Sequence, residues 1–239
     1  MRTRFLTTKA KEVEYYRDIR IHADTGMHEQ AFDLVVKHAK RGGSVLDVGA
    51  GAGALAQRLA DADFRVTGLD VDPLKWIPKD IPFLELDIDK GVRSRVAGTF
   101  DVICCLEVIE HVENPWDLLR DLRDLLNDDG RLIVSTPNVT SFLSRALFLL
   151  KGTLHSFDEN GLAYGHINPL TEFEIVTIAG RIGLDVLEVR AGGYLPVLDL
   201  TSIRPKSLLF NGLRLMAYLL ARGRKEGWCL FFVMRRAGR

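Results

Sequence analysis

The segment VLDVGAGAGALAQRLA (45–60) limits the fold of this chain more than any other part of the sequence. An apolar run is followed by a glycine-rich turn, and a helical pattern begins directly after the turn. Glycines permit positive φ angles and let backbone amides approach a bound group closely. The segment therefore predicts a strand, a ligand-binding turn and a helix in immediate succession.

Short apolar runs alternate with helical patterns from Gly43 onward, which is typical of βαβ units and a parallel sheet. Their apolar character fits central strands that helices cover on both faces. The last two runs lack an obvious crossover helix between them, so we expect them to pair antiparallel at the edge of the sheet. The runs are 44–49, 64–70, 81–88, 99–106, 130–137, 183–190 and 227–236.

Local signals place helices where this scheme needs them. Asn114 and Pro115 supply an N-cap and a first-turn proline for one helix. TEFE (171–174) is a capping-box pattern, and Gly183 can end the helix that this pattern opens. Upstream of the first strand, residues 13–40 are predicted to form two helices.

The length of 239 residues, 47% of them hydrophobic, suffices for one sizeable α/β domain. We expect a single domain whose insertions project over the rim of the sheet at which α/β proteins bind their ligands. Its expected parts are a helical cap over 1–42, a cofactor-binding core over 43–137, and substrate-side insertions over 138–169 and 191–226.

Lys and Arg together number 32, as do Asp and Glu, so the overall charge predicts no polyanionic partner. The charge is uneven, because the stretch 200–239 has nine basic residues against one acid, Glu226. Aromatic side chains do not interleave with these basic residues, which argues against a nucleic-acid partner. Cys104, Cys105 and Cys229 lack metal-site spacing, and the N-terminus lacks an apolar signal segment, so we expect a cytoplasmic protein with reduced thiols.

The glycine pattern alone does not determine which ligand the turn binds, because Gly49-x-Gly51-x-x-Ala54 also satisfies the dinucleotide fingerprint of NAD-dependent oxidoreductases. Two acids narrow the choice. Asp47 lies where a nicotinamide site normally has an apolar residue, and its carboxylate can engage an ammonium group. Asp70 ends the second strand, where it can accept hydrogen bonds from both hydroxyls of a ribose.

The sequence at this point resembles the class I S-adenosylmethionine-dependent methyltransferases. The glycine motif from Asp47 to Gly53 matches the first motif of that family, GLDVDP (68–73) the second, and LDID (86–89) the third. The resemblance is close over 43–137 and weaker through Arg190. It implies an α/β, Rossmann-like seven-stranded sheet, mostly parallel with an antiparallel last strand. It also implies that these residues bind S-adenosylmethionine: Asp47, Gly49, Ala50, Gly51, Gly53, Asp70, Val71, Asp87, Ile88, Leu106 and Glu107.

The stretch EVIEHVENP (107–115) follows the fourth apolar run and should lie beside the methyl donor. One interpretation is structural: Glu107 lines the donor site, while Glu110 and His111 cap the next helix, where the dipole favours acids. A second makes His111 a general base for a substrate hydroxyl, with Glu110 as the other candidate catalytic residue. Both interpretations remain open at this stage.

A third interpretation is a divalent metal site. The stretch resembles the E-x-x-E-H branch of the family, which includes ubiquinone-pathway O-methyltransferases and small-RNA 2′-O-methyltransferases. In that branch a later histidine precedes a helix start, and the matching residue here is His166, five positions before Thr171. The implied ligands are Glu107, Glu110, His111 and His166. They would suit Mg²⁺ and, with two imidazoles, also Mn²⁺, Fe²⁺ or Zn²⁺.

Each insertion carries an apolar helical stripe, and a stripe of this kind packs against protein or docks on an apolar surface. The local basic excess favours a peripheral membrane contact through 207–225, at the inner face of a membrane. The expected activity is methyl transfer to a small-molecule or lipid-linked hydroxyl, such as that of a sugar or a phenol. The alternative is a non-catalytic regulator that binds S-adenosylmethionine. The oligomeric state is not predicted. The stripes consist of Phe142, Leu143, Ala146, Leu147 and Leu150, and of Leu209, Leu213, Met216 and Leu220.

Overall fold

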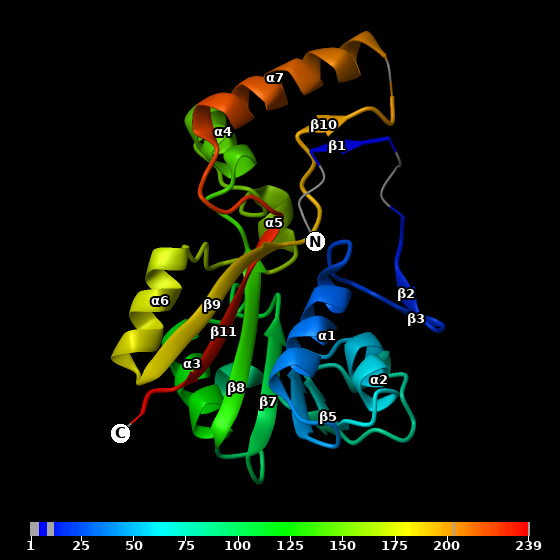
Figure 1. Ribbon diagram of the computed structural model, residues 1–239, viewed down its shortest axis with the longest axis vertical. Coiled ribbons are helices and arrows are strands. Elements are labelled where there is room, and N and C mark those ends of the chain that lie inside the picture. Colours follow the sequence, from blue (N-terminus) through cyan, green and yellow to red (C-terminus); the bar gives the residue numbers. More distant parts are fainter. Residues whose placement is uncertain (1–4, 9–11, 203, 239) are drawn as a thin grey trace.

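The computed structural model describes residues 5–8, 12–202 and 204–238. It contains a seven-stranded sheet with the strand order β6-β5-β4-β7-β8-β11-β9 (Figure 1). This is the seven-stranded α/β sheet that the sequence predicts. The strands are β4 (Ser44–Val48), β5 (Arg65–Asp70), β6 (Phe83–Glu85), β7 (Phe100–Leu106), β8 (Leu126–Pro137), β9 (Leu184–Gly192) and β11 (Cys229–Arg236).

The strands β4 to β8 run parallel, whereas the last strand of the chain runs against its neighbours. β11 lies between β8 and β9 and pairs antiparallel with both. Its residues from Cys229 to Met234 are all buried, because this strand packs apolar side chains on both faces of the sheet. The antiparallel pairing of the last two runs is confirmed.

Helices cover both faces of the sheet, as expected. On one face lie α1 (Met27–His38) and α2 (Ala54–Ala60), which pack with Val45 and Val102 of the central strands. On the other lie α3 (Pro115–Asp124) and α6 (Glu172–Arg181). The helices thus cover both faces of the sheet with apolar side chains. A ligand site is therefore expected at the edge formed by the carboxyl ends of β4, β5 and β7.

The predicted helix boundaries are confirmed for α3 and α6. The Asn114 side chain accepts hydrogen bonds from the backbone of Trp116 and Asp117 at the start of α3. At α6, Thr171 and Glu174 form the complete capping box. Short 3-10 turns follow β5 and β6, at Pro73–Lys75 and Ile88–Lys90.

The expectation of two helices over 13–40 is wrong. A two-stranded hairpin, β2 (Tyr15–Tyr16) and β3 (Ile19–Arg20), precedes α1. β-branched and aromatic residues favour extended backbone. Ile19 and Ile21, which alternate along the chain, are both buried against α2. The N-terminal cap therefore contains one helix among the described residues.

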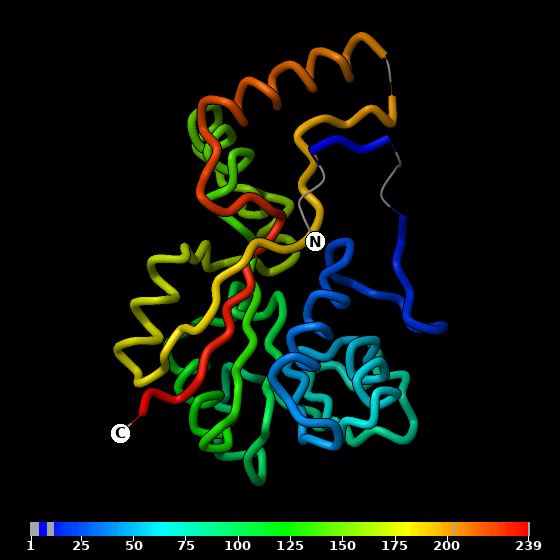
Figure 2. The backbone as a smooth tube through the Cα atoms, in the orientation of Figure 1, coloured from blue at the N-terminus to red at the C-terminus, as the bar shows by residue number. Residues whose placement is uncertain are grey.

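The two insertions form a lobe beyond the carboxyl edge of the sheet, which we call the upper lobe (Figure 2). It contains α4 (Phe142–Lys151), α5 (Glu159–Ala163), β10 (Leu198–Asp199) and α7 (Pro205–Ala221). The N-terminal strand β1 (Leu6–Thr7) joins it by pairing parallel with β10. Among the described residues, no helix is long and apolar enough to cross a membrane. The three cysteines are free and buried.

Candidate active site

The glycine loop after β4 is fastened to β5 by its own backbone. The amides of Gly49 and Ala50 both donate to the Leu69 carbonyl, at 2.8 and 3.0 Å. Gly49 has a φ of 72°, and a Cβ there would lie 2.2 Å from Cγ2 of Val108. Gly51 also has a positive φ, of 53°, but a Cβ there would meet no atom within 4 Å. Gly49 therefore allows a close backbone approach, while Gly51 leaves open space for a ligand.

Asp70 connects this loop to the end of β5. Its Oδ2 accepts a hydrogen bond from the Gly51 amide at 2.8 Å, and its Oδ1 accepts one from the Asp72 amide at 3.2 Å. A carboxylate has about four acceptor positions, so these two bonds leave acceptor capacity for ligand hydroxyls. The side chain is thus held in one place at the mouth of the loop.

Asp47 is a buried carboxyl group, only 3% exposed. Its Oδ2 has no hydrogen-bond partner among the described residues. Burial raises the pKa of Asp47 to about 7, and the negative charge of Asp70 raises it further in the same direction. A buried carboxyl group with one unpaired oxygen is costly to ionise, and a cationic ligand at that oxygen would lower the cost. The residue fits the ammonium group of S-adenosylmethionine.

The raised pKa of Asp47 predicts a pH dependence of ligand binding. An ammonium group would pair with the ionised carboxylate, so we expect the affinity for S-adenosylhomocysteine to fall as the pH decreases below about 7. The stability of the ligand-free protein should show the opposite trend. Because the pKa of Asp47 is higher in the folded state than in the unfolded state, its contribution to stability is fully present below the unfolded-state pKa and is lost as the pH rises toward 7. Calorimetry and thermal unfolding from pH 5.5 to 8, roughly the range around that pKa, measure both trends.

The isosteric variant Asp47→Asn tests the same assignment. It should bind S-adenosylhomocysteine at least about tenfold more weakly, with a flatter pH profile, while the free variant unfolds at a higher temperature than the wild type at pH 8. A variant with unchanged affinity would show that Asp47 serves only the fold.

The other residues expected at the cofactor site lie along the same edge of the sheet. Val71 follows β5 and is 64% exposed, and Asp87 caps the short turn that contains Ile88. Leu106 and Glu107 lie at the end of β7. Trp76 was not predicted at this edge. Its ring fills the space above Gly53 and Gly68, where added Cβ atoms would lie 2.9 and 2.3 Å from it. A glycine inside a strand, Gly68, was the signal that could have indicated it.

Glu107 has an unusual backbone conformation at the end of β7. Its φ is 54°, a left-handed value that is strained for a residue with a side chain. Ser135 on β8 holds it by accepting from its amide at 3.0 Å and donating to its Oε1 at 2.8 Å. Burial raises the pKa of Glu107 to about 7, and the nearby charge of Asp24 adds to this effect. Neither Ser135 nor Asp24 was predicted.

Glu110 is completely buried, and neither of its carboxylate oxygens has a hydrogen-bond partner among the described residues. Burial, followed by the charge of Glu107, raises its pKa well above the ordinary value. Buried polar atoms in folded proteins almost always have partners, so an unsatisfied carboxyl group at a ligand site requires an explanation. A ligand or an ion that the carboxylate binds would supply one.

His111 and His166 complete a group around Glu110. One potential ligand atom from each of the three residues lies within 4.8 Å of the others. The two imidazole rings are 4.7 Å apart and nearly perpendicular. Burial and the neighbouring imidazole of His166 lower the pKa of His111, which favours its neutral form. Glu107, predicted as a further metal ligand, lies outside this group and is bonded to Ser135.

The segment that carries His166 is held against Glu110 by the backbone. The amides of Ile167 and Asn168 both donate to the Glu110 carbonyl, at 2.9 and 3.0 Å. Nδ1 of His166 lies 2.8 Å from the carbonyl oxygen of Ser156. A protonated Nδ1 that donates to this carbonyl leaves Nε2 as the free nitrogen, which is the usual arrangement of a metal-binding imidazole.

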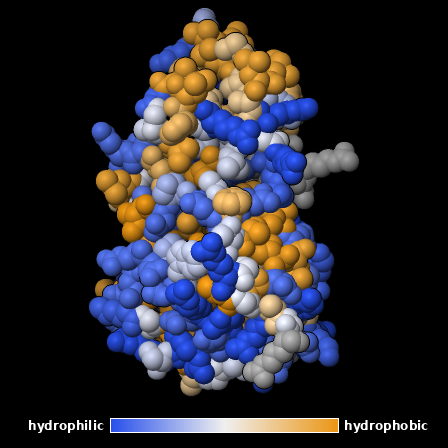
Figure 3. Space-filling view, turned by 90° about the vertical axis from the view of Figure 1, so that its left-hand side faces the viewer, coloured by the Kyte–Doolittle hydropathy of each residue, from blue (hydrophilic) through white to orange (hydrophobic). Residues whose placement is uncertain are grey.

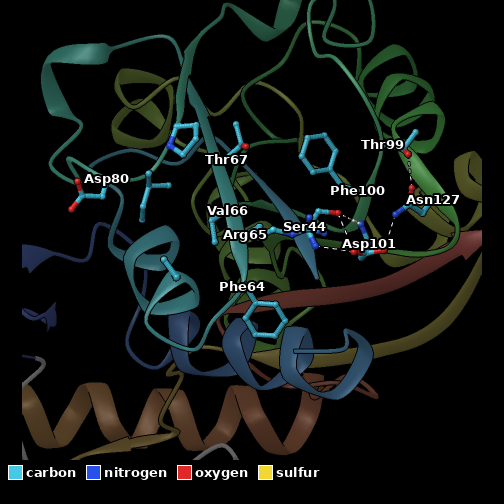
Figure 4. Close-up of a pocket in the computed structure, with 13 residues that line it drawn as sticks. Ser44, Phe64, Arg65, Val66, Thr67, Asp80, Thr99, Phe100, Asp101 and Asn127 are labelled. Carbon is cyan, nitrogen blue, oxygen red and sulfur yellow. Dashed lines mark hydrogen bonds between the residues drawn. The ribbon is translucent and has the colours of Figure 1, made fainter. Parts of the chain in front are cut away.

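A cavity of about 670 Å³ lies elsewhere, at the amino ends of the strands (Figure 4). Its polar groups already satisfy each other: Asp101 accepts from both the amide and hydroxyl of Ser44 and from the Asn127 side chain. In parallel α/β sheets ligands bind at the carboxyl ends, so this cavity is not the active site.

Comparisons with known proteins find relatives and solved structures that are methyltransferases. The ubiquinone biosynthesis O-methyltransferase of Actinobacillus pleuropneumoniae is 37% identical over 111 residues, which cover 41% of this chain and 47% of the relative. The chain thus spans about half the length of that relative. The enzyme of the same name from Cupriavidus pinatubonensis is 26% identical over 179 residues, 68% of each chain.

Solved structures show the same fold. Magnesium protoporphyrin IX methyltransferase from Synechocystis PCC 6803, with bound SAH, aligns with a TM-score of 0.57 at 18% identity, covering 88% of this chain and 82% of that one. A SAM-dependent methyltransferase from Archaeoglobus fulgidus aligns with a TM-score of 0.58 at 15% identity, covering 87% and 94%. The model of the methyltransferase domain family matches residues 23–189, most of the chain. The glycine loop is therefore the methyltransferase motif rather than the dinucleotide fingerprint, and the chain belongs to the family of S-adenosylmethionine-dependent methyltransferase domains.

Proposed function

We propose that this protein transfers the methyl group of S-adenosylmethionine to a hydroxyl oxygen of a small-molecule or lipid-linked acceptor, such as a phenol or a sugar. The observation that carries the proposal is the buried Glu110 beside the imidazoles of His111 and His166; among the described residues, neither of its oxygens has a hydrogen-bond partner. The relatives named as ubiquinone biosynthesis O-methyltransferases support an oxygen acceptor.

Residues of the chain perform the positioning. Bound S-adenosylmethionine supplies an activated sulfonium methyl group. Asp47 would hold its ammonium group and Asp70 its ribose hydroxyls, while the open space at Gly51 admits it to the loop. Glu110, His111 and His166 would face the acceptor, whose oxygen must lie in line with the methyl group and lose its proton.

The three residues also fit a divalent ion. An orphaned buried carboxylate and an imidazole with its second nitrogen fixed by a carbonyl form a donor set for such an ion. One carboxylate and two imidazoles suit Mn²⁺, Fe²⁺ or Zn²⁺ as well as Mg²⁺. An ion bound there would supply a Lewis acid for the acceptor oxygen.

A screen of acceptors tests this proposal. The purified full chain is incubated with S-adenosylmethionine and phenols, sugars, amines and thiols, before and after exhaustive chelation. We expect methyl ethers as products, and loss of turnover on chelation that added divalent ions restore. Methylation of amines or thiols alone would contradict an oxygen acceptor. A chain that binds S-adenosylhomocysteine but methylates none of these classes would instead fit a non-catalytic binding protein.

A further inference from the structure

The helix α7 of the upper lobe is turned with its apolar side outward. Its outward side carries Leu209, Leu213, Met216 and Leu220, the stripe that the sequence spacing identifies, with exposed fractions of 65, 47, 53 and 81%. Asn211, by contrast, is buried against the protein. In a surface helix of a soluble protein the apolar stripe normally faces the core, so this orientation requires a reason.

Specific contacts hold the inward side of α7 against the protein. The exposure of its apolar side is therefore not the result of a loosely packed helix. Asn211 accepts from the Asp199 amide at 2.8 Å and donates to the Asp199 carbonyl at 2.7 Å. Tyr218 packs edge-on against the rings of Phe5 and Phe142. These contacts orient the helix about its axis and leave the leucine side free.

The end of α4 extends the same apolar surface. α4 packs against α7, and its last turn exposes Phe148, Leu149 and Leu150 by 60, 85 and 79%. The hydrophobic side chains gather at the upper end of the molecule, where α4 and α7 lie (Figure 3). We call this surface the apolar crest; its members are Phe148, Leu149, Leu150, Leu208, Leu209, Phe210, Leu213, Met216, Leu219 and Leu220.

Basic side chains flank the apolar crest at both ends of α7. Arg204 and Lys206 are exposed at its start, and Arg222 and Arg224 at its end. No acidic residue occurs in the segments 139–157 and 200–225. The crest therefore presents a row of large apolar side chains between two positive ends, without any negative charge.

This charge pattern indicates which kind of partner the apolar crest suits. Two copies of the chain that met crest to crest would bring four positive ends together with no acid to offset them. An anionic lipid bilayer offers both an apolar interior and negative headgroups beside it. We propose that the apolar crest docks the protein peripherally on the surface of an anionic membrane, with α7 lying in the interface. At 17 residues, α7 would lie along about 25 Å of that interface.

Docking in this orientation has a geometric consequence. The upper lobe lies beyond the carboxyl edge of the sheet, the same edge that carries Glu110 and His166 (Figure 1). The active-site edge would then face the membrane. If the proposed function holds, an acceptor dissolved in the bilayer can reach the site, but the docking itself does not depend on catalysis.

Flotation of the full chain with lipid vesicles tests the proposal. Vesicles of phosphatidylcholine containing about one third phosphatidylglycerol should bind the protein at least about tenfold more tightly than vesicles of phosphatidylcholine alone. The triple variant Leu209→Gln, Leu213→Gln, Leu220→Gln should lose at least about tenfold in affinity for the anionic vesicles. Neutralising Arg204, Lys206, Arg222 and Arg224 to Gln should remove the preference for anionic lipid and the sensitivity to salt.

Matched controls distinguish docking through the apolar crest from nonspecific hydrophobic binding and from misfolding. Phe173→Gln removes a side chain of 79% exposure from α6, outside the crest, and should leave vesicle binding unchanged. All variants should keep the wild-type affinity for S-adenosylhomocysteine, which shows that they are folded. Absence of wild-type binding to anionic vesicles, or binding that the triple variant retains, would overturn the proposal. A wild-type dimer in gel filtration that the triple variant converts to a monomer would assign the crest to a second copy instead.

Discussion

Replacing Glu110 by glutamine is expected to lower methyl transfer at least about 100-fold, because it removes the charge but not the shape of the buried carboxyl group. Neither carboxylate oxygen of Glu110 has a hydrogen-bond partner in the part of the chain that the structure describes, so their expected role is toward the acceptor or an ion. The fold should survive, because glutamine keeps the size and shape of the side chain and removes the cost of burying a charge at a position where burial already raises the pKa. Thermal unfolding and the affinity for S-adenosylhomocysteine should stay close to those of the wild type.

The variant separates the three interpretations of this cluster when it is compared with two others. A metal site predicts that Glu110→Gln and His166→Gln both abolish activity and reduce the divalent metal bound by the purified protein. A general base predicts that His111→Gln alone is severe. A merely structural cluster predicts that all three retain activity in proportion to their stability. Glu113→Gln, an exposed carboxylate on the same loop, is the matched control and should behave as wild type.

Replacing Gly49 by alanine is expected to destabilise the protein by about 3 kcal/mol, because two separate costs add at one position. The φ of 72° is strained for a residue with a side chain, and the new Cβ would lie 2.2 Å from Cγ2 of Val108, where β4 and β7 converge. For a chain of this length such a loss lowers the melting temperature by roughly 6–12 °C. Chemical or thermal unfolding of the ligand-free protein measures it.

Gly51→Ala is the matched control, because it shares the positive φ but not the collision. Its stability should fall by only about 1 kcal/mol. The added methyl group enters the open space of the loop, so its larger effect should be on the affinity for S-adenosylhomocysteine. Equal melting temperatures for the two variants would show that the close approach of Gly49 and Val108 is not rigid.

The sheet could be predicted from sequence because each of its signals is local. Apolar runs gave the strands, Asn114 and Thr171 gave helix starts, and the glycines with Asp47 and Asp70 placed the ligand loop. The hairpin before α1 was missed because Tyr15 to Ile21 is stabilised by contacts with α2, which lies far along the chain. A helical pattern and a short strand pair cannot be distinguished there without that contact.

The chemistry of the site was only partly visible in the sequence. The spacing of Glu110 and His111 is local, but His166 could be added only by resemblance, since it lies 55 positions beyond His111. That the Glu110 oxygens have no hydrogen-bond partner among the residues described is a property of packing and has no sequence signal. The stripe of α7 was identified correctly as a stripe, yet periodicity cannot say which side faces the protein. The pairing of Asn211 with the backbone of Asp199 decides this.

The most direct test of the central claim is to compare a prenylated phenol with the corresponding aniline as acceptors, using S-adenosylmethionine with an isotopically labelled methyl group. Mass spectrometry of the products identifies the atom that receives the label. The arrangement of Glu110, His111 and His166 at the carboxyl edge predicts a labelled methyl ether from the phenol and little or no product from the aniline. A labelled amine without any ether, or no transfer to any hydroxyl acceptor by a chain that binds S-adenosylhomocysteine, would contradict it.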